Sequence, residues 1–347
     1  MQDINNTNSQ NEMKRETPYF REREVPIEVS HKSISQLLRE MSNTGFQGRK
    51  LGEVVDVWEE MIRDPNLTII MGLSGSMSTT GMWKIICWLI EKRYIDVLVS
   101  TGANISEDLY EALGGTYWKG SPLVDDEDLL RHKIDRFYDV FADEYEYRRM
   151  EEKISEFMME LDDEKVYSSR EFLWLFGKWL AERGIYCIVS TAYKHGVPIY
   201  SPALVDSGYG IACIHALLKK GKRIKLDQAE DFRELLDICK DRRTGVIYIG
   251  GGVPKDFVQL MAVGRDLLRG WSNPLPHEYA IQITTDSPQW GGLSGCTLEE
   301  AVSWGKTSPK GKKVTCYCDA TIALPLVAHA LLERVGFTRK GPEFRFA

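Results

Sequence analysis

The stretch that decides the fold reads Leu67-Thr68-Ile69-Ile70-Met71, followed by Gly72-Leu73-Ser74-Gly75-Ser76-Met77-Ser78-Thr79-Thr80-Gly81. Its first five residues form a short apolar run bounded by a glycine, which predicts a buried strand. The ten residues that follow are rich in glycine and hydroxyl groups. Apolar residues then recur at helical spacing through Met82, Ile85, Ile86 and Leu89. We therefore expect a strand, a glycine-rich turn and a helix in this order.

Similar short apolar runs occur along the rest of the chain, and most precede a polar loop and a helical pattern. They lie at residues 96–100, 198–201, 245–249, 279–283 and 314–317. Alternation of this kind predicts an α/β fold, Rossmann-like, with a mostly parallel open sheet and helices on both faces. Apolar spacing of three and four predicts extra helical segments at residues 34–62 and a largely helical region at 124–183. We also expect a helix from about Ser106, because Glu107 and Asp108 suit the positive N-terminus of a helix.

Composition narrows the class of protein. The chain has 347 residues, 43% of them hydrophobic, and a net charge of −7. It therefore has no overall basic field for nucleic acid or anionic lipid. We also expect no membrane segment, because no apolar stretch approaches the roughly 20 residues of a span. The seven cysteines form no C-x-x-C pair, which is typical of a reduced cytoplasmic protein. None of the six histidines has metal-ligand spacing, so we expect no metal site.

The first 27 residues differ from the rest. They are rich in Asn, Gln, Glu and Arg, and their few apolar residues show no period. Such a segment cannot offset the entropy of ordering by itself, so we expect a mobile polar arm at residues 1–27. No later linker divides the chain, and we expect one domain over residues 28–347.

The loops after the predicted strands carry the polar chemistry. In an open parallel sheet ligands bind at the carboxyl ends of the strands. The loop 72–81 offers backbone N–H groups and five hydroxyls ahead of a helix, which suits a pyrophosphate. Gly250-Gly251-Gly252-Val253-Pro254 resembles a phosphate loop, although a triple glycine is often only a tight turn. Asp286 and Asp319 also follow strands, where a carboxylate binds ribose hydroxyls or caps a helix.

A lysine near the C-terminal end is the candidate catalyst. The segment Glu299-Glu300-Ala301-Val302-Ser303-Trp304-Gly305-Lys306 places an amine directly after an indole and a glycine. A lysine attacks carbon only when it is neutral, and removal from water or a neighbouring cation favours that form. The indole of Trp304 would help to exclude water from the amine. The alternative is a packed tryptophan beside a solvated lysine, as for most lysines.

The run EAVSWGK, the triplet Gly250-Gly251-Gly252 and Ser201-Pro202-Ala203-Leu204 followed by Asp206 together resemble the deoxyhypusine synthase family. The resemblance extends from about Val54 to Leu332. It implies that Lys306 carries the aminobutyl group of spermidine as an imine while NAD stores a hydride. It also implies a homotetramer whose sites lie between paired subunits.

The resemblance assigns a cofactor set and a substrate set. The residues expected around NAD are Ser76, Thr101, Glu107, Asp206, Gly251, Gly252, Thr285, Ser294, Asp319 and Ala320. Glu300 is expected to hold an amine of spermidine, and Trp304 to flank its carbon chain. This chain departs from the family at three anchors: Ile211 and Leu293 replace aspartates, and Asp256 replaces a histidine. Asp256 and Asp286 are candidate substitutes for the lost charges.

These departures leave the acceptor amine open. A lysine of a translation factor as acceptor would make the protein a deoxyhypusine synthase, whereas putrescine as acceptor would make it a homospermidine synthase. A third reading, motivated by Ile211 and Leu293, is a catalytically silent NAD-binding subunit that regulates an active paralogue. Retention of Lys306 argues against that reading.

Overall fold

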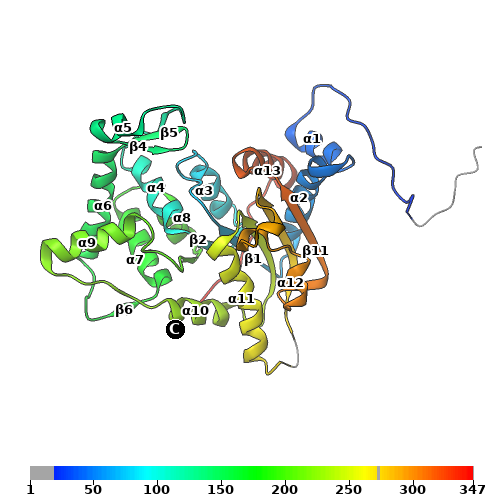
Figure 1. The fold of residues 1–347 in the computed structure, drawn as a ribbon. Coiled ribbons are helices and arrows are strands. Elements are labelled where there is room, and N and C mark those ends of the chain that lie inside the picture. Colours follow the sequence, from blue (N-terminus) through cyan, green and yellow to red (C-terminus); the bar gives the residue numbers. More distant parts are fainter. Residues whose placement is uncertain (1–18, 272–273, 347) are drawn as a thin grey trace, which may run out of the picture.

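A six-stranded sheet lies at the centre of the computed structural model, which describes residues 19–271 and 274–346 (Figure 1). Every strand pairing in this sheet is parallel, in the order β11-β10-β9-β1-β2-β7. The strands are β1 Leu67–Leu73, β2 Val97–Ser100, β7 Ile199–Tyr200, β9 Arg243–Ile249, β10 His277–Thr284 and β11 Thr307–Tyr317. The predicted parallel α/β sheet is confirmed.

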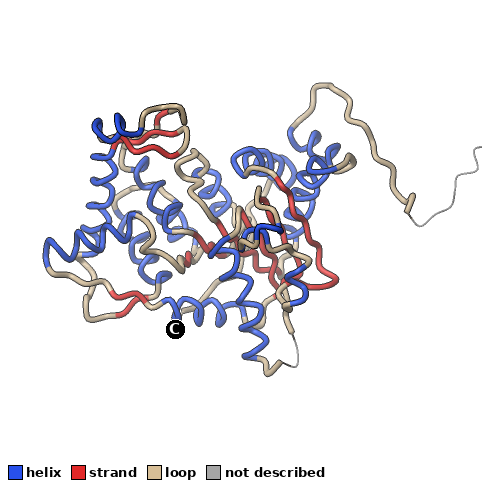
Figure 2. The backbone as a smooth tube through the Cα atoms, viewed as in Figure 1, coloured by secondary structure: helices blue, strands red, loops and turns tan. Residues whose placement is uncertain are grey.

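Helices surround the sheet, as the tube in Figure 2 shows. Their bounds are α1 Ile34–Met41, α2 Phe46–Arg63, α3 Trp83–Glu91, α4 Gly102–Ala112, α5 Asp126–His132, α6 Glu144–Met158, α7 Ser169–Glu182, α8 Ile188–His195, α9 Gly208–Lys220, α10 Gln228–Cys239, α11 Gly252–Leu268, α12 Glu300–Ser303 and α13 Ala320–Val335. Two short 3-10 turns, η1 Pro288–Trp290 and η2 Leu293–Gly295, precede α12.

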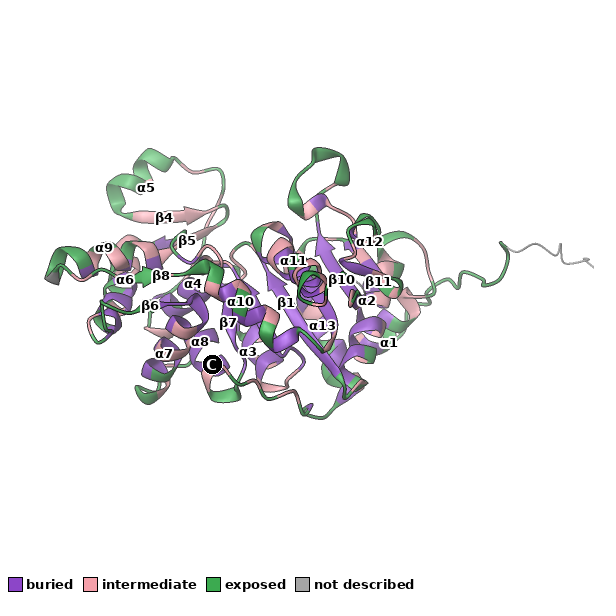
Figure 3. Ribbon diagram, turned by 90° about the horizontal axis from the view of Figure 1, so that it is seen from below, coloured by how far each residue is buried: buried purple, intermediate pink, exposed green. Residues whose placement is uncertain are grey.

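The two faces of the sheet bury separate cores because successive side chains of a strand point to opposite sides. In β1, Ile69 and Met71 join the core that includes residues of α2 and α13. Ile70 joins the other core, with Val258 and Met261 of α11. Figure 3 shows β1 and β10 as buried between these layers. Helices therefore cover both faces, as predicted.

The region 124–183 is less helical than expected. It contains α5, α6 and α7, but β4 Ile134–Phe137 and β5 Val140–Asp143 form an antiparallel hairpin that β3 Trp118–Lys119 extends. Two-residue strands β6 Val166–Tyr167 and β8 Lys225–Leu226 also pair. The sequence IDRFYDVFAD mixes apolar and charged residues without strict alternation, so its strand pattern is weak.

Helix α4 begins at Gly102, earlier than the expected start near Ser106. Thr101 is extended (φ −63°, ψ 151°) and precedes the first helical residue. Glu107 and Asp108 therefore lie mid-helix and buried, and not in the first turn facing the positive end of the helix.

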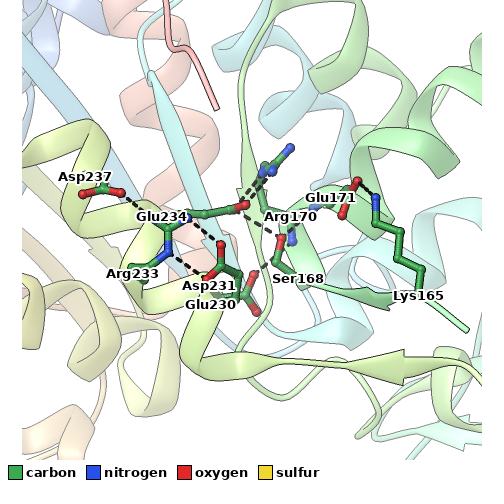
Figure 4. A network of polar contacts seen from close by, with 9 residues as sticks. All are labelled: Lys165, Ser168, Arg170, Glu171, Glu230, Asp231, Arg233, Glu234 and Asp237. Carbon is green, nitrogen blue, oxygen red and sulfur yellow. Dashed lines mark hydrogen bonds and ion pairs between the residues drawn. The ribbon is translucent and has the colours of Figure 1, made fainter. Parts of the chain in front are cut away.

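A buried polar network joins α7 to α10 beside the sheet (Figure 4). Arg170 donates two hydrogen bonds to Glu234, at 2.8 and 2.6 Å, and its backbone N–H donates to Asp231 at 3.1 Å. Burial raises the pKa of Asp231 to about 6. The two helices are thus fixed to each other by charge as well as by packing.

The arm expected at residues 1–27 lies outside the described residues up to position 18. Residues 19 to 27 are exposed, and their backbone forms no helix or strand. None of the helices in residues 19–271 and 274–346 is long and apolar enough to cross a membrane.

Candidate active site

The loops after five strands begin side by side at the carboxyl edge of the sheet. Backbone hydrogen bonds connect neighbouring strand ends: Thr101 donates to Leu73 at 3.2 Å, Ser74 to Ile249 at 3.0 Å, Gly250 to Ile283 at 2.8 Å, and Cys318 to Thr284 at 3.1 Å. These loops carry most of the residues singled out from the sequence. The parallel sheet therefore gathers them at one edge, where ligands bind in such folds.

Asn104 of α4 organises the first loop, although no sequence pattern had pointed to it. Its side chain is fully buried. The side-chain oxygen accepts a hydrogen bond from the N–H of Met77 at 2.7 Å, and its amide nitrogen donates to the Thr101 hydroxyl at 2.8 Å. The Thr101 hydroxyl in turn donates to the Gly75 carbonyl at 2.8 Å. The loops after β1 and β2 are thus held as one unit.

Glu107 lies behind the same loop. Its carboxylate accepts a hydrogen bond from the Ser76 hydroxyl, and burial raises its pKa to about 7. Ser76, Thr101 and Glu107, three predicted cofactor residues, therefore lie together. Asp206 is exposed on the loop after β7, which packs tightly against Gly102: a Cβ there would come within 2.4 Å of the Ser207 hydroxyl.

The triple-glycine loop approaches the segment 294–296 closely. A Cβ on Gly251 would lie 2.3 Å from the Cα of Ser294, so no other residue fits without a backbone shift. Gly250 and Gly252 have φ values of 74° and 57°, a region that favours glycine. The N–H of Gly252 donates to the Ser294 hydroxyl at 3.2 Å.

A cleft of about 220 Å³ lies between these loops. Five predicted cofactor residues line it: Gly251, Thr285, Ser294, Asp319 and Ala320. It adjoins a groove of about 910 Å³, because Asp319 lines both. Glycine loops beside the Asp319 carboxylate fit a dinucleotide, because they let a phosphate approach the backbone closely and the carboxylate can accept hydrogen bonds from ribose hydroxyls. Asp286, expected to bind substrate, lines this cleft instead.

Lys306 follows α12 and immediately precedes β11. Gly305, with φ 68°, makes the turn between them. The Lys306 N–H donates to the Ala301 carbonyl, and its carbonyl accepts from the His277 N–H, both at 3.0 Å. Hydrogen bonds from α12 and β10 thus fix the backbone that carries the amine.

The Lys306 side chain is buried, with 8% of the residue exposed. Its Nζ lies 3.4 Å from Oδ1 of Asp256 and 5.2 Å from the centroid of the Trp304 ring. Trp304 itself is 64% exposed. The indole therefore covers the amine from the solvent side, while a carboxylate approaches it from α11.

A second lysine, which the sequence reasoning missed, lies nearby. Lys255 of α11 is fully buried and donates to Gln282 at 3.0 Å and to the Cys296 carbonyl. Burial lowers its pKa to about 8, and the charge of Lys306 acts in the same direction. The only sequence signal was its place three residues after the triple glycine.

Glu300, the last of the expected substrate residues, is exposed, and its charge acts on both Cys296 and Lys255. Ile211 on α9 and Leu293 in η2, where aspartates were expected from the resemblance, are 43% and 49% exposed. Among the described residues, no group of three His, Cys, Asp or Glu side chains could hold a metal ion.

Known proteins match this sequence over most of the chain. The family model of deoxyhypusine synthase matches residues 36–331. The chain belongs to the deoxyhypusine synthase family. "Probable deoxyhypusine synthase 2" of Methanosarcina mazei is 50% identical over 324 residues, covering 92% of this chain and 93% of that protein. The protein of the same name from Archaeoglobus fulgidus is 52% identical, covering 84% and 96%.

Two more distant matches also carry the name of this family. A "Deoxyhypusine synthase-like protein" of Chlorobaculum tepidum is 38% identical, with 87% of each chain covered. The crystal structure of a "putative deoxyhypusine synthase" from Entamoeba histolytica has a TM-score of 0.62 at 16% identity, covering 89% of this chain and 95% of its own. That structure supports the fold, and the family relationship supports a transferase.

Proposed function

We propose that this protein transfers the 4-aminobutyl group of spermidine, through an imine on Lys306, to an acceptor amine in an NAD-dependent reaction. The observation that carries the proposal is the burial of the Lys306 amine between Asp256 and Trp304. A lysine with only a structural role is seldom buried, because removing an ammonium from water is costly even beside a carboxylate. A nucleophile gains a site from which water is largely excluded.

The residues around the amine have separable tasks. Lys306 Nζ forms the bond to the aminobutyl carbon, and the bond from that carbon to the departing diaminopropane nitrogen breaks. Asp256 Oδ1 is close enough to accept the proton that the ammonium of Lys306 must release. Glu300 would hold the distal ammonium of the substrate, and Trp304 would shield the imine from hydrolysis. The acceptor amine then displaces Lys306.

NAD would supply acceptance of a hydride from the carbon beside the secondary amine of spermidine and return of that hydride to the new imine, so that it would not be consumed overall. We propose that Gly251, Gly252, Thr285, Ser294, Asp319 and Ala320 hold it in the cleft, with Ser76, Thr101 and Glu107 supporting the first loop. Asp206 would complete the site from the loop after β7. Asp286 lines the same cleft and would act there rather than on the polyamine.

The family relationship favours a protein lysine as acceptor, the deoxyhypusine synthase reaction. Putrescine, the homospermidine synthase alternative, is favoured by Ile211 and Leu293, because an altered polyamine pocket changes which amine fits. The silent regulatory subunit is disfavoured by the buried Lys306. We further propose a cytoplasmic homotetramer in which residues 28–347 act as one catalytic domain, with neither nucleic acid nor membrane as a partner.

Product analysis tests this function. The protein is incubated with NAD, spermidine labelled in its butyl group, and either putrescine or the hypusine-bearing factor of the same organism. Label in the factor supports deoxyhypusine synthesis, and label in homospermidine supports the alternative. Release of diaminopropane with neither acceptor labelled would contradict transfer, and no release at all would support the silent subunit. Lys306→Ala is the control and should form no product.

A further inference from the structure

Lys255 is a buried ammonium whose two hydrogen-bond acceptors are both uncharged. Only 1% of the residue is exposed, and its Nζ donates to the side-chain oxygen of Gln282 and to the Cys296 carbonyl. A buried charge without a carboxylate hydrogen-bonded to it destabilises the folded state, because the lost hydration is not replaced by an opposite charge. Stability alone does not account for a lysine here, because an apolar residue of similar volume avoids that cost.

Gln282 uses its whole side chain to connect three segments. It lies on β10 with 1% exposed. Its amide nitrogen donates to the Gly250 carbonyl at 3.0 Å and to the Ser294 carbonyl at 2.8 Å, while its oxygen accepts from Lys255 at 3.0 Å. A polar side chain in the middle of a buried strand is tolerated when it is satisfied in this way. Gln282 thus joins the triple-glycine loop, the segment 294–296 and α11.

The same contacts reach the candidate nucleophile from two directions. Asp256, the residue whose carboxylate approaches the Lys306 amine, follows Lys255 directly on α11. Cys296, whose carbonyl accepts from Lys255, begins the segment that leads through α12 to Lys306. Lys255 therefore spans the gap between the helix that carries the carboxylate and the segment that carries the amine.

We propose that Lys255 and Gln282 form a positioning pair, which sets the approach of Asp256 to Lys306 and holds the triple-glycine loop in register with them. The pair would connect the nucleophile to the dinucleotide loop through buried hydrogen bonds. The catalytic role of this pair rests on the proposed function, whereas its structural role does not.

A double-mutant cycle tests the catalytic part. The variants are Lys255→Met, Gln282→Met and the combination, and the measurement is the rate at which borohydride traps the imine at saturating NAD and spermidine. Each single variant should lower this rate about tenfold or more, with a smaller change in the half-saturating concentration of spermidine. The double variant should be no more than about threefold slower than the slower single variant, because both remove the same unit.

Lys313→Met is the matched control. The Lys313 amine also donates to backbone carbonyls, those of Ser308 at 2.9 Å and Gly311 at 3.1 Å, but these lie within its own strand β11. Its trapping rate should stay within about threefold of the wild type. The proposal would be overturned if the double variant lost trapping rate by the product of the two single losses. It would also be overturned if Lys313→Met lost as much trapping rate as Lys255→Met.

Amide hydrogen exchange tests the structural part without any substrate. The N–H groups of Gly252 and Lys306 are bonded to Ser294 and Ala301. Both should exchange at least about fivefold faster in Lys255→Met and Gln282→Met, and at wild-type rates in Lys313→Met. Unchanged exchange in folded variants overturns the proposal, even if no imine is ever trapped. If Lys255→Met does not fold, Gln282→Met carries the same comparison. A wild type that traps no imine while these amides respond would contradict only the proposed function.

Discussion

The Nζ of Lys306 lies 3.4 Å from Oδ1 of Asp256, although the two residues are 50 positions apart in the sequence. The contact joins the segment after α12 to the first turns of α11, and it places a proton acceptor beside the candidate nucleophile. Asp256 stands where the resemblance to the family led us to expect a histidine. A carboxylate therefore faces the candidate nucleophile.

Asp256→Asn should impair the reaction of the amine. The substitution keeps the shape of the side chain but removes the negative charge that faces Lys306. We expect kcat/KM for spermidine to fall at least about tenfold, equal to about 1.4 kcal/mol of transition-state stabilisation. Initial-rate kinetics check this, with Asp163→Asn, an exposed carboxylate between α6 and β6, as control. Equal kinetics of the two variants would remove Asp256 from the mechanism.

Trp304→Ala should let water hydrolyse the imine before transfer, without unfolding the protein. Because Trp304 is 64% exposed, its loss should change the melting temperature by less than about 3 °C. Water would then reach the imine, and the release of free aminobutyraldehyde relative to product should rise at least about fivefold. Trp290→Ala, which removes a 77% exposed indole, is the matched control. A product ratio that does not change would show that the indole does not shield the imine.

The fully buried Asp108 should make the protein less stable as pH rises through the acidic range. Burial raises its pKa from 3.8 to about 7, so the folded state binds more protons than the unfolded state between these values. The free energy of unfolding therefore falls as pH rises from about 4 to 7.

Asp108→Asn removes this titration, and its amide oxygen can still accept the hydrogen bond from the Ile188 N–H that Asp108 accepts at 2.5 Å. Relative to the wild type, the variant should gain at least about 1 kcal/mol between pH 4 and pH 8. Denaturant unfolding at both pH values measures this difference. Parallel pH profiles of the two proteins would refute the assignment.

The C-terminal segment should be required for stability through Arg339. Its guanidinium donates to both carboxylate oxygens of Asp96, at 2.9 and 2.7 Å, and both residues are buried. Arg339→Met leaves a buried carboxylate with less compensation and should cost about 3 kcal/mol of unfolding free energy. The double variant with Asp96→Asn should lose less than Arg339→Met alone. Lys340→Met, at an exposed position, should leave the free energy of unfolding unchanged. A double variant that loses the sum of the losses of Arg339→Met and Asp96→Asn would contradict this account.

The strands of the sheet could be predicted because most of them are buried on both faces and therefore appear as continuous apolar runs. The run 67–71 and the run 245–249 both became strands. The hairpin of β4 and β5 was missed because its half-buried strands lack that signal. The start of α4 was misplaced because Glu107 and Asp108 looked like first-turn acids, yet they are buried within the helix.

The site shows a similar division. The glycine loops were predictable because they follow strands, and parallel strands bring their ends to one edge. The contact between a particular carboxylate and the Lys306 amine could not be predicted, because it depends on packing between segments that are distant in the sequence. Asp256 contacts Lys306, whereas Asp286 lines the cleft. Lys255 was missed because a lysine on a helix usually faces water.

The most direct test of the central claim is to find where the aminobutyl group becomes attached. The protein is incubated with NAD and spermidine carrying an isotope label in its butyl group, reduced with borohydride, digested and analysed by mass spectrometry. The account predicts a labelled aminobutyl adduct on Lys306, absent without NAD and absent in Lys306→Arg. Label on Lys255 alone, or no label on any lysine, would contradict it.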